Sequence, residues 1–303
     1  MKEVDQKPWR IAITGGTGLI GRELRKEWEE AGHEVLTVSR KDDGNGIFWD
    51  PENEKIDIAT LEGLDAVVHL AGEPIAQRWT GEVRERIYSS RVKSTRLLVR
   101  SFAKLKTPPR VFLSASGINY YPSTEMGARL DEQADVGDDF LSRVCLHWEA
   151  EASKANPLVS RVCLLRTAVV LSPLGGALAK LLPVFSKGLG GRIGTGKQPF
   201  PWISIGDYKR VCSYLLFDSE LTGPINVVAP KAATNESFTK ALAKVLGKPA
   251  SLAVPKMAIR LAFGEMGRLT VIEGVDAAPA ALLSDGFEFQ DSDLEEALED
   301  LLA

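Results

Sequence analysis

The stretch that decides the fold is IAITGGTGLIG, residues 11–21, in which a short apolar run passes directly into a glycine-rich loop. The run IAIT is apolar and β-branched, as expected for a buried strand. Gly15, Gly18 and Gly21 follow at three-residue spacing, and a helical pattern covers residues 19–31. Strand, glycine turn and helix in direct succession predict a phosphate-binding site, because a helix N-terminus offers unpaired N–H groups and partial positive charge to an anion.

Each glycine has a physical role in such a loop. The first permits a tight turn after the strand, the second lets the backbone approach a pyrophosphate, and the third allows the helix to pack closely on the sheet. The spacing GxxGxxG, rather than GxGxxG, is typical of short-chain dehydrogenases/reductases. The alternative is a glycine-rich turn that binds no ligand. We predict a bound dinucleotide, held by Gly15, Thr17, Gly18, Leu19, Ile20 and Gly21.

The end of the second predicted strand, residues 34–39, indicates which dinucleotide is bound. An NAD site usually has Asp or Glu about 20 residues after the glycines, on the adenosine ribose. Here the strand ends in Ser39-Arg40-Lys41 without an acid, and Arg40 lies 19 residues after Gly21. A hydroxyl and a guanidinium would hold a 2′-phosphate, which a carboxylate would repel. We therefore predict NADP(H), bound by Ser39 and Arg40. The alternative is that Arg40 and Lys41 are solvated loop residues and cofactor choice is made elsewhere.

Strand and helix patterns continue to alternate through the first half of the chain. Apolar runs at residues 65–71, 110–116 and 162–171 are separated by helical patterns at 82–105 and 139–155. This order predicts an α/β fold, namely a Rossmann-type doubly wound parallel sheet with a smaller C-terminal substrate lobe. The predicted domains are an NADP-binding Rossmann domain, 1–175 completed by 203–229, and a C-terminal lobe, 176–202 and 230–303.

Composition excludes several classes of protein. The 303 residues are 44% hydrophobic and 26% charged, with a net charge of −4, which is an ordinary globular composition. No apolar stretch approaches the roughly 20 residues that cross a bilayer, and no basic cluster indicates nucleic-acid binding. A polar start predicts no secretory signal, and three cysteines without a CxxC pair favour a reducing compartment, so we expect a cytoplasmic location. Three histidines form no ligand pattern, and no metal is expected.

Several strings resemble extended short-chain dehydrogenases/reductases, the group that includes nucleotide-sugar epimerases and dehydratases. Besides the glycine loop, these are HLAGEPI (69–75) and VFLSASGINYY (111–121). Further strings, among them SRVKSTRLLV, LLRTAVVLSPLGGAL and GLGGRIGTGKQPFPWISIGD, are similar to the atypical "epimerase family" proteins, which are sometimes labelled SulA-like cell-division inhibitors. The resemblance covers essentially the whole chain and implies an NADP-binding Rossmann fold with a C-terminal substrate lobe. It also implies that the cofactor is lined by Leu70, Ala71, Gly72, Ser114 and Thr167.

The resemblance further implies a catalytic Ser that holds the substrate oxygen, and a Tyr-x-x-x-Lys pair on the next helix that moves the proton. Ser116 is the best match for the Ser. The pair has no counterpart, because Leu141 and Cys145 stand at its positions and none of the five tyrosines has Lys four residues later. We consider Tyr121, or its neighbour Tyr120, as a substitute acid. The alternative is an aromatic wall beside the substrate or simple packing of the loop.

Four side chains are predicted to contact the substrate. Glu73 follows a buried strand, and Arg192, Lys197 and Trp202 belong to a basic, aromatic-bearing loop that could grip a phosphate or carboxylate; a solvated loop is the alternative.

The predicted function is that of an NADP(H)-dependent carbonyl oxidoreductase or nucleoside-diphosphate-sugar epimerase. Its expected substrate is a small carbonyl, alcohol or sugar nucleotide. Neither nucleic acid nor a membrane is expected as a partner, and a homodimer or a protein partner is compatible with the sequence. The missing pair favours an alternative, a catalytically weak NADPH-binding sensor or regulatory protein that acts through a protein partner.

Overall fold

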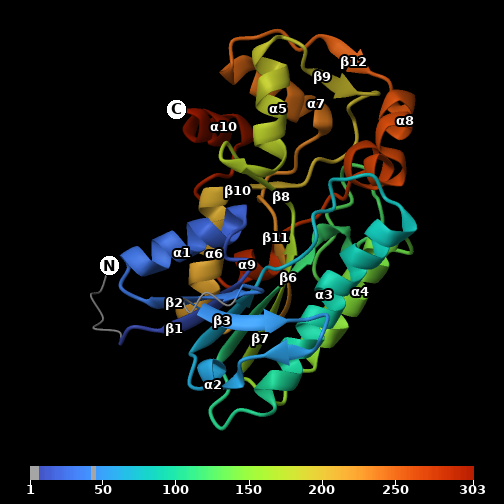
Figure 1. Ribbon diagram of the computed structural model, residues 1–303. Helices are drawn as coiled ribbons and strands as arrows, with labels where there is room; N and C mark the ends of the chain where they lie inside the picture. The colour runs from blue at the N-terminus through green and yellow to red at the C-terminus, as the bar shows by residue number, and fades with distance from the viewer. Residues whose placement is uncertain (1–6, 42–45) are drawn as a thin grey trace.

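The computed structural model describes residues 7–41 and 46–303. Its larger part is an eight-stranded sheet in the order β11-β7-β6-β5-β1-β2-β3-β4, parallel throughout except between β3 and β4 (Figure 1). This confirms the predicted Rossmann-type fold. The strands are β1 (Arg10–Thr14), β2 (Glu34–Ser39), β3 (Gly46–Asp50), β4 (Lys55–Ile56), β5 (Ala66–His69), β6 (Val111–Gly117), β7 (Arg161–Thr167) and β11 (Gly223–Val227).

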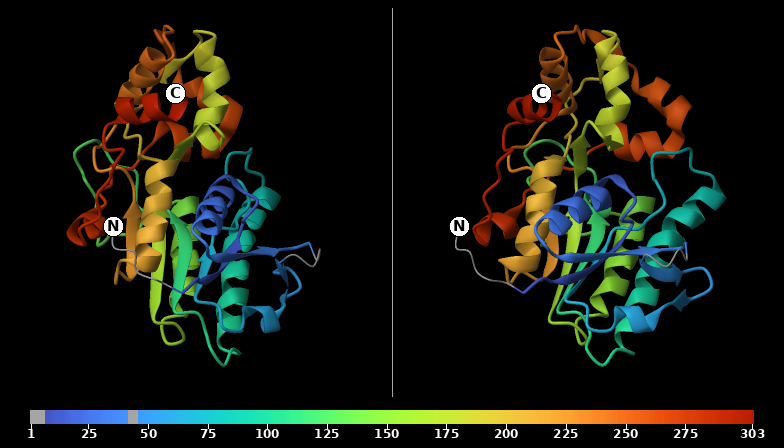
Figure 2. Two further views of the ribbon diagram at one scale, coloured as in Figure 1. Left: turned by 90° about the vertical axis from the view of Figure 1, so that its left-hand side faces the viewer. Right: turned by 60° about the vertical axis from the view of Figure 1, so that its left-hand side comes forward.

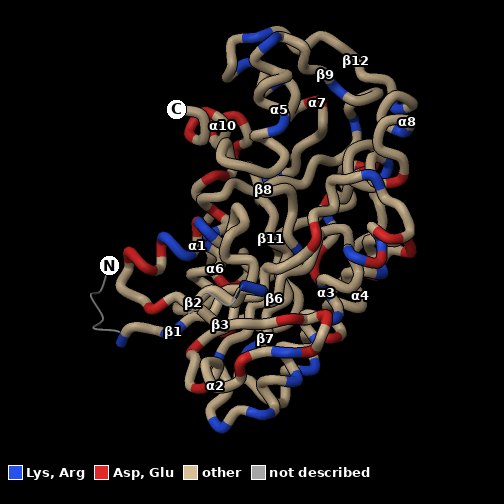
Figure 3. The backbone as a smooth tube through the Cα atoms, viewed as in Figure 1, with Lys and Arg blue, Asp and Glu red and all other residues tan. Residues whose placement is uncertain are grey.

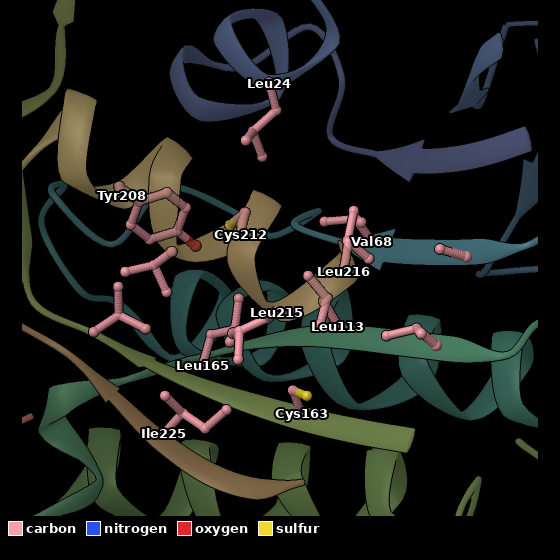
Figure 4. Close-up of a cluster of buried hydrophobic side chains, with 14 of the residues drawn as sticks. Leu24, Val68, Leu113, Cys163, Leu165, Tyr208, Cys212, Leu215, Leu216 and Ile225 are labelled. Carbon is pink, nitrogen blue, oxygen red and sulfur yellow. The ribbon is translucent and has the colours of Figure 1, made fainter. Parts of the chain in front are cut away.

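Helices cover both faces of the sheet. One face packs against α1 (Leu19–Glu30) and α6 (Ile205–Phe217), and the other against α3 (Gly81–Phe102) and α4 (Phe140–Ser153). The side chains of β1 alternate between the two faces, as a strand requires: Ile11 and Ile13 belong to the first core and Ala12 to the second. Figure 4 shows the first core, where apolar side chains of α6 meet those of the strands. Three short helices complete this part: α2 (Ile58–Leu61), η1 (Ile118–Tyr120) and α9 (Ala280–Ser284).

The smaller lobe lies at the carboxyl ends of the strands, where β7 continues almost directly into β8 (Figure 2). It contains two pairs of parallel strands, β8 (Val169–Ser172) with β10 (Trp202–Ser204) and β9 (Gly191–Ile193) with β12 (Leu252–Val254). Its helices are α5 (Gly176–Ser186), α7 (Asn235–Val245), α8 (Lys256–Gly267), the π-helical turn η2 (Arg268–Ile272) and α10 (Leu294–Leu302).

Two features of the lobe boundary differ from the sequence expectation. The single apolar run predicted at residues 162–171 is two strands, because the chain leaves the large sheet at Ala168 and β8 pairs with β10 instead. The segment after α8 also returns to the larger part, since Leu282 and Phe287 pack into the core between the sheet and α6. The run of residues 230–303 therefore does not pack as one continuous C-terminal lobe.

Charged residues of both signs are interspersed over both parts of the molecule (Figure 3). The terminal helix α10 is acidic on its exposed side, while Ala297 and Leu298 are buried in the core of the lobe. This is the usual arrangement of an amphipathic surface helix, with one apolar side buried and the charged side in solvent. Within the described residues, no helix is long and apolar enough to cross a bilayer.

The junction of β1 and α1 depends on a glycine without a side chain. A Cβ on Gly21 would collide with the carbonyl oxygen of Gly15 and lie 2.7 Å from the Cα of Gly16. We predict that Gly21→Ala lowers the free energy of unfolding by about 1–3 kcal/mol, the usual cost of overpacking. Gly81→Ala is the control, because a Cβ at Gly81 meets nothing within 4 Å; it should leave stability unchanged or raise it by up to about 1 kcal/mol. Urea unfolding measures both, and equal effects would contradict the prediction.

Candidate functional site

The ends of β1 and β5 meet at the point in the sheet where the strand order reverses, which is where ligands bind in open α/β sheets. The hydroxyl of Thr14 accepts hydrogen bonds from the backbone N–H groups of Leu70 and Ala71, at 3.0 and 3.1 Å. Gly15 turns with φ +69°, and a Cβ there would lie 3.0 Å from the peptide between Leu70 and Ala71. The two loops are thus held in direct contact, and their backbones together form the floor of the candidate site.

The N-terminus of α1 is suited to receive an anion. Its N-cap is Gly18, which provides no capping side chain, and the first turn contains no acidic residue. Thr17 and Gly18 are exposed, whereas Leu19 and Ile20 are half-buried beneath them. The first N–H groups of the helix therefore have no side-chain partner and can donate to a phosphate. This arrangement fits the pyrophosphate of a dinucleotide, because the glycines leave its approach open.

The end of β2 lies beside the glycine loop, since β1 and β2 pair along their full length. The hydroxyl of Ser39 accepts a hydrogen bond from the N–H of Lys41 at 3.0 Å, which turns the chain at this edge. Arg40 is exposed on that turn. Both predicted 2′-phosphate residues thus lie at the same edge of the sheet as the glycine loop.

His69 ends β5 as a fully buried residue. Because the Thr14 hydroxyl accepts two N–H groups, it donates to Nδ1 of His69 at 2.7 Å, and Nε2 then donates to the hydroxyl of Thr95 at 3.0 Å. That hydroxyl donates in turn to the carbonyl of Arg91 at 2.6 Å. Burial, aided by the Arg91 charge, lowers the pKa of His69 to about 3. The imidazole is therefore neutral and connects the floor of the site to α3.

The predicted catalytic Ser116 lies at the end of β6 and is only 5% exposed. Its hydroxyl donates to Oε1 of Glu149 at 2.6 Å. Glu149 also forms a bidentate ion pair with Arg166, with both N···O distances 2.9 Å, and both residues are buried. The pair was not foreseen, because its partners belong to α4 and β7 and no local pattern links them. Because the Ser116 hydroxyl donates its one hydrogen bond to Glu149, it could interact with a ligand only as a hydrogen-bond acceptor.

The structure does not favour the predicted acid role of Tyr121. The side chain is 1% exposed, and its hydroxyl donates to Oδ1 of Asn226 at 2.7 Å and accepts from Arg166 at 2.8 Å. Burial raises its pKa, with Arg166 and Asn226 opposing that change. A buried phenol with both hydrogen-bonding directions occupied is a packing residue, the alternative that the sequence left open. Tyr120 is half-buried, with its ring 3.5 Å from the centre of the Arg166 guanidinium.

The helix that would present the Tyr-x-x-x-Lys pair is α4. Leu141 is 4% exposed and Cys145 is 6% exposed, so both positions are packed rather than open. Burial raises the pKa of Cys145 to about 11, and the thiol is neutral at ordinary pH. Neither side chain can donate or accept a proton in place of the pair.

The remaining cofactor-lining predictions occupy the carboxyl edge of the sheet. Leu70 and Ala71 are half-buried and Gly72 is exposed. Ser114 is fully buried inside β6, one strand away from the loop. Thr167 ends β7 and donates to the carbonyl of Leu165 at 3.1 Å.

The four predicted substrate residues do not share one environment. Trp202 is 1% exposed and lies in the core of the C-terminal lobe, so its predicted place in an open loop is wrong. The Gly, Lys and Pro residues that precede Trp202 resemble a loop, but Trp202–Ser204 pairs with β8 as a strand. Arg192 donates to the carbonyl of Gly194 at 2.9 Å, and Lys197 is exposed. Glu73 lies at the switch point and accepts from Gln77 at 3.0 Å.

Residues 11–228 match the family described as NAD dependent epimerase/dehydratase, which covers the whole sheet and the site described above. The chain belongs to this family. Residues 254–301 match a second family, described as a domain of unknown function (DUF1731). The resemblance drawn from the sequence motifs is therefore confirmed.

Relatives within the family span nearly the whole chain. An epimerase family protein of Mycobacterium bovis is 38% identical over 291 residues, 95% of this chain and 96% of the relative. The human epimerase family protein SDR39U1 is 35% identical over 298 residues, 97% of this chain and 100% of the relative.

Two solved structures also superpose on nearly the whole chain. The crystal structure of human SDR39U1 (isoform 2) with NADPH superposes with a TM-score of 0.88 and 34% identity, covering 96% of this chain and 98% of that one. The crystal structure of a nucleoside-diphosphate sugar epimerase from Corynebacterium glutamicum superposes with a TM-score of 0.79 and 34% identity. The match covers 98% of this chain and 59% of that one.

The buried neutral His69 makes stability depend on pH. The folded state keeps His69 unprotonated down to about pH 3, whereas the unfolded chain binds the proton near pH 6.5. The contribution of neutral His69 to the free energy of unfolding is therefore present above pH 6.5 and is lost as the pH falls below it. We predict that wild-type protein loses about 2 kcal/mol of unfolding free energy through His69 between pH 7.5 and 5.

Denaturant unfolding at several pH values measures this effect. His69→Gln should be less stable at pH 7.5 but lose correspondingly less on acidification, and His147→Gln, at an exposed position, should follow the wild type. Parallel pH profiles for wild type and His69→Gln would show that the assigned ionisation is wrong.

Proposed function

We propose that the chain binds NADP(H) at the β1/β5 switch point and acts as a short-chain-type carbonyl oxidoreductase or nucleoside-diphosphate-sugar epimerase. The observation that carries the proposal is the contact between Gly15 and the Leu70–Ala71 peptide beneath an uncapped α1 N-terminus. That geometry presents the backbone N–H groups at the start of α1 to a pyrophosphate, with no capping side chain of Gly18 to compete for them. The crystal structure of human SDR39U1 with NADPH supports the same cofactor.

Arg40 and Ser39 would distinguish the phosphorylated cofactor. They lie at the end of β2, one strand from the glycine loop, and the turn contains no acid among Ser39, Arg40 and Lys41. An exposed guanidinium can form paired hydrogen bonds with a 2′-phosphate. The bound cofactor would supply or accept a hydride.

The chain's own groups suit an oxygen-bearing substrate at the other end of the site. The Ser116 hydroxyl donates a hydrogen bond to Glu149, so its oxygen can accept a hydrogen bond from a substrate hydroxyl. A carbonyl oxygen would instead need a donor. With Leu141 and Cys145 buried, that donor must be water or a substrate group. Loss of a positioned acid or base commonly costs two to four orders of magnitude in rate, so the proposed turnover is slow.

The burial of Leu141 and Cys145 supports a second candidate, a catalytically weak NADPH sensor. Leu141 and Cys145 are packed where the Tyr and Lys of the pair would stand, so the groups for proton transfer are missing while the proposed cofactor contacts are kept. In that case cofactor occupancy would set the conformation of the C-terminal lobe, and a protein partner would read it.

The proposal includes a cytoplasmic location and a small-molecule substrate. The three cysteines are all buried free thiols, as expected of a protein in a reducing compartment. Fractionation with antibody detection tests the location, and recovery with secreted material would contradict it.

Arg40→Ala tests the choice of cofactor. We predict that it weakens NADPH binding by about 10- to 100-fold, the loss of one or two charge-assisted hydrogen bonds, and leaves NADH binding unchanged. Arg25→Ala, which removes an exposed guanidinium paired with Glu29 on α1, should alter neither. Both affinities can be measured by fluorescence of the reduced nicotinamide. Equal losses for the two cofactors, or none, would mean that Arg40 does not contact the 2′-phosphate.

Turnover separates the enzyme from the sensor. NADPH oxidation is followed against a panel of aldehydes, ketones and nucleotide sugars, with direct cofactor binding measured on the same samples. The enzyme proposal predicts turnover that falls about 10²-fold in Ser116→Ala, because the oxygen that positions the substrate hydroxyl is lost, with NADPH affinity retained. Ser123→Ala, an exposed serine paired with Glu273, is the control. Tight NADPH binding without turnover on any substrate would favour the sensor instead.

A further inference from the structure

One guanidinium beside the candidate site contacts no carboxylate among the described residues. Arg91, on α3, lies against the loop that follows β5, and a Cβ on Gly72 would be 3.0 Å from the centre of its guanidinium. Its Nη1 donates to the carbonyls of Glu73 and Ile87 at 3.0 and 3.1 Å. Among the described residues it forms no ion pair, and the carboxylate of Glu73 pairs with Arg86 instead, at 3.5 Å.

The comparison with Arg166 makes this arrangement unusual. Both guanidinium groups lie on the same face of the sheet, but Arg166 is buried and neutralised by the bidentate carboxylate of Glu149, whereas Arg91 is partly exposed and forms no ion pair among the described residues. Burial lowers the pKa of Arg91, which reflects the cost of removing its charge from water. A partly buried charge that no carboxylate contacts directly costs free energy, and proteins often use such a group to bind a ligand of complementary charge or a hydrogen-bond acceptor.

Arg91 also retains donors for a ligand. All three of its hydrogen bonds, to Glu73, Ile87 and Ser90, use Nη1. Nε and Nη2 donate to no group within residues 7–41 and 46–303, and the face of the guanidinium packs 5.3 Å from the ring centre of Trp148. The group is thus held in place through one nitrogen and one face, with its other nitrogens available.

The order of strands fixes which part of a bound dinucleotide Arg91 would meet. The proposed 2′-phosphate contact is at the end of β2, and the pyrophosphate contact is at α1 after β1. Since β5 lies on the opposite side of β1 from β2, the dinucleotide continues past the loop of Gly72 with its nicotinamide half. Arg91 packs against that loop.

We propose that Arg91 faces the nicotinamide half of the bound cofactor and makes the site prefer NADPH over NADP⁺. This inference rests on the proposed function, because it requires the dinucleotide at the switch point. The oxidised nicotinamide ring carries a positive charge and the reduced ring does not, so a fixed cation penalises only the oxidised form. At an effective dielectric constant of about 20, two like charges separated by about 10 Å repel enough to change an affinity on the order of tenfold.

The test compares the two cofactor forms in one set of variants. The dissociation constant of NADPH is measured by nicotinamide fluorescence and that of NADP⁺ by competition, for wild type, Arg91→Met and Arg91→Lys. The inference predicts that the ratio Kd(NADP⁺)/Kd(NADPH) falls on the order of tenfold in Arg91→Met and is retained in Arg91→Lys. Arg96→Met is the matched control, because Arg96 is on the same helix but pairs with Glu151 at 2.8 Å, and it should keep the wild-type ratio.

A purely structural role for Arg91 gives a different result. Weakening of both cofactors by the same factor, or an unchanged ratio, would overturn the inference while leaving the proposed function standing. If the wild type bound neither form, the proposed function itself would fail. Near-UV circular dichroism checks folding, and Arg91→Gln, which keeps an N–H donor for the Glu73 carbonyl without the charge, provides the same ratio if Arg91→Met is too unstable.

Discussion

The Thr14 hydroxyl holds together the two loops on which the site depends. It accepts the N–H groups of Leu70 and Ala71 and donates to the buried imidazole of His69, so all of its hydrogen-bonding capacity joins β1 to β5. This leaves the Gly15 backbone against the Leu70–Ala71 peptide, where no side chain fits. A flat, bare floor at the switch point is what a pyrophosphate requires, and the uncapped N-terminus of α1 provides the donors above it.

Electrostatics divide the site into two unlike halves. Along the proposed path of the cofactor, Arg40 at the 2′-phosphate end is exposed, and Arg91 at the nicotinamide end contacts no carboxylate among the described residues, so both are available to a ligand. On the side of the expected chemistry, the charges of Glu149 and Arg166 neutralise each other in the core and also engage Ser116 and Tyr121. Polar groups used in this way stabilise the strand ends but have little capacity left for proton transfer. The structure therefore favours cofactor binding more strongly than rapid catalysis.

The parts of this protein that local sequence determines could be predicted. The glycine loop, the alternation of strands with helices and α1 follow from local patterns in the sequence, and the structure bears them out. The errors arise where the environment comes from distant segments. Trp202 resembles a loop residue until its strand's pairing with β8 is known. Tyr121 resembles a free acid until Arg166 and Asn226 are found to be bonded to its hydroxyl. The packing of Arg91 against Gly72 could not be foreseen, because nothing in its own helix shows that the loop after β5 lies against it.

A crystal structure of the wild-type chain grown with NADPH tests the central claim most directly. We predict the pyrophosphate at the N–H groups that begin α1, above the contact of Gly15 with the Leu70–Ala71 peptide, and the 2′-phosphate at Ser39 and Arg40. A nucleotide bound elsewhere, or one whose 2′-phosphate points away from the end of β2, would contradict this claim.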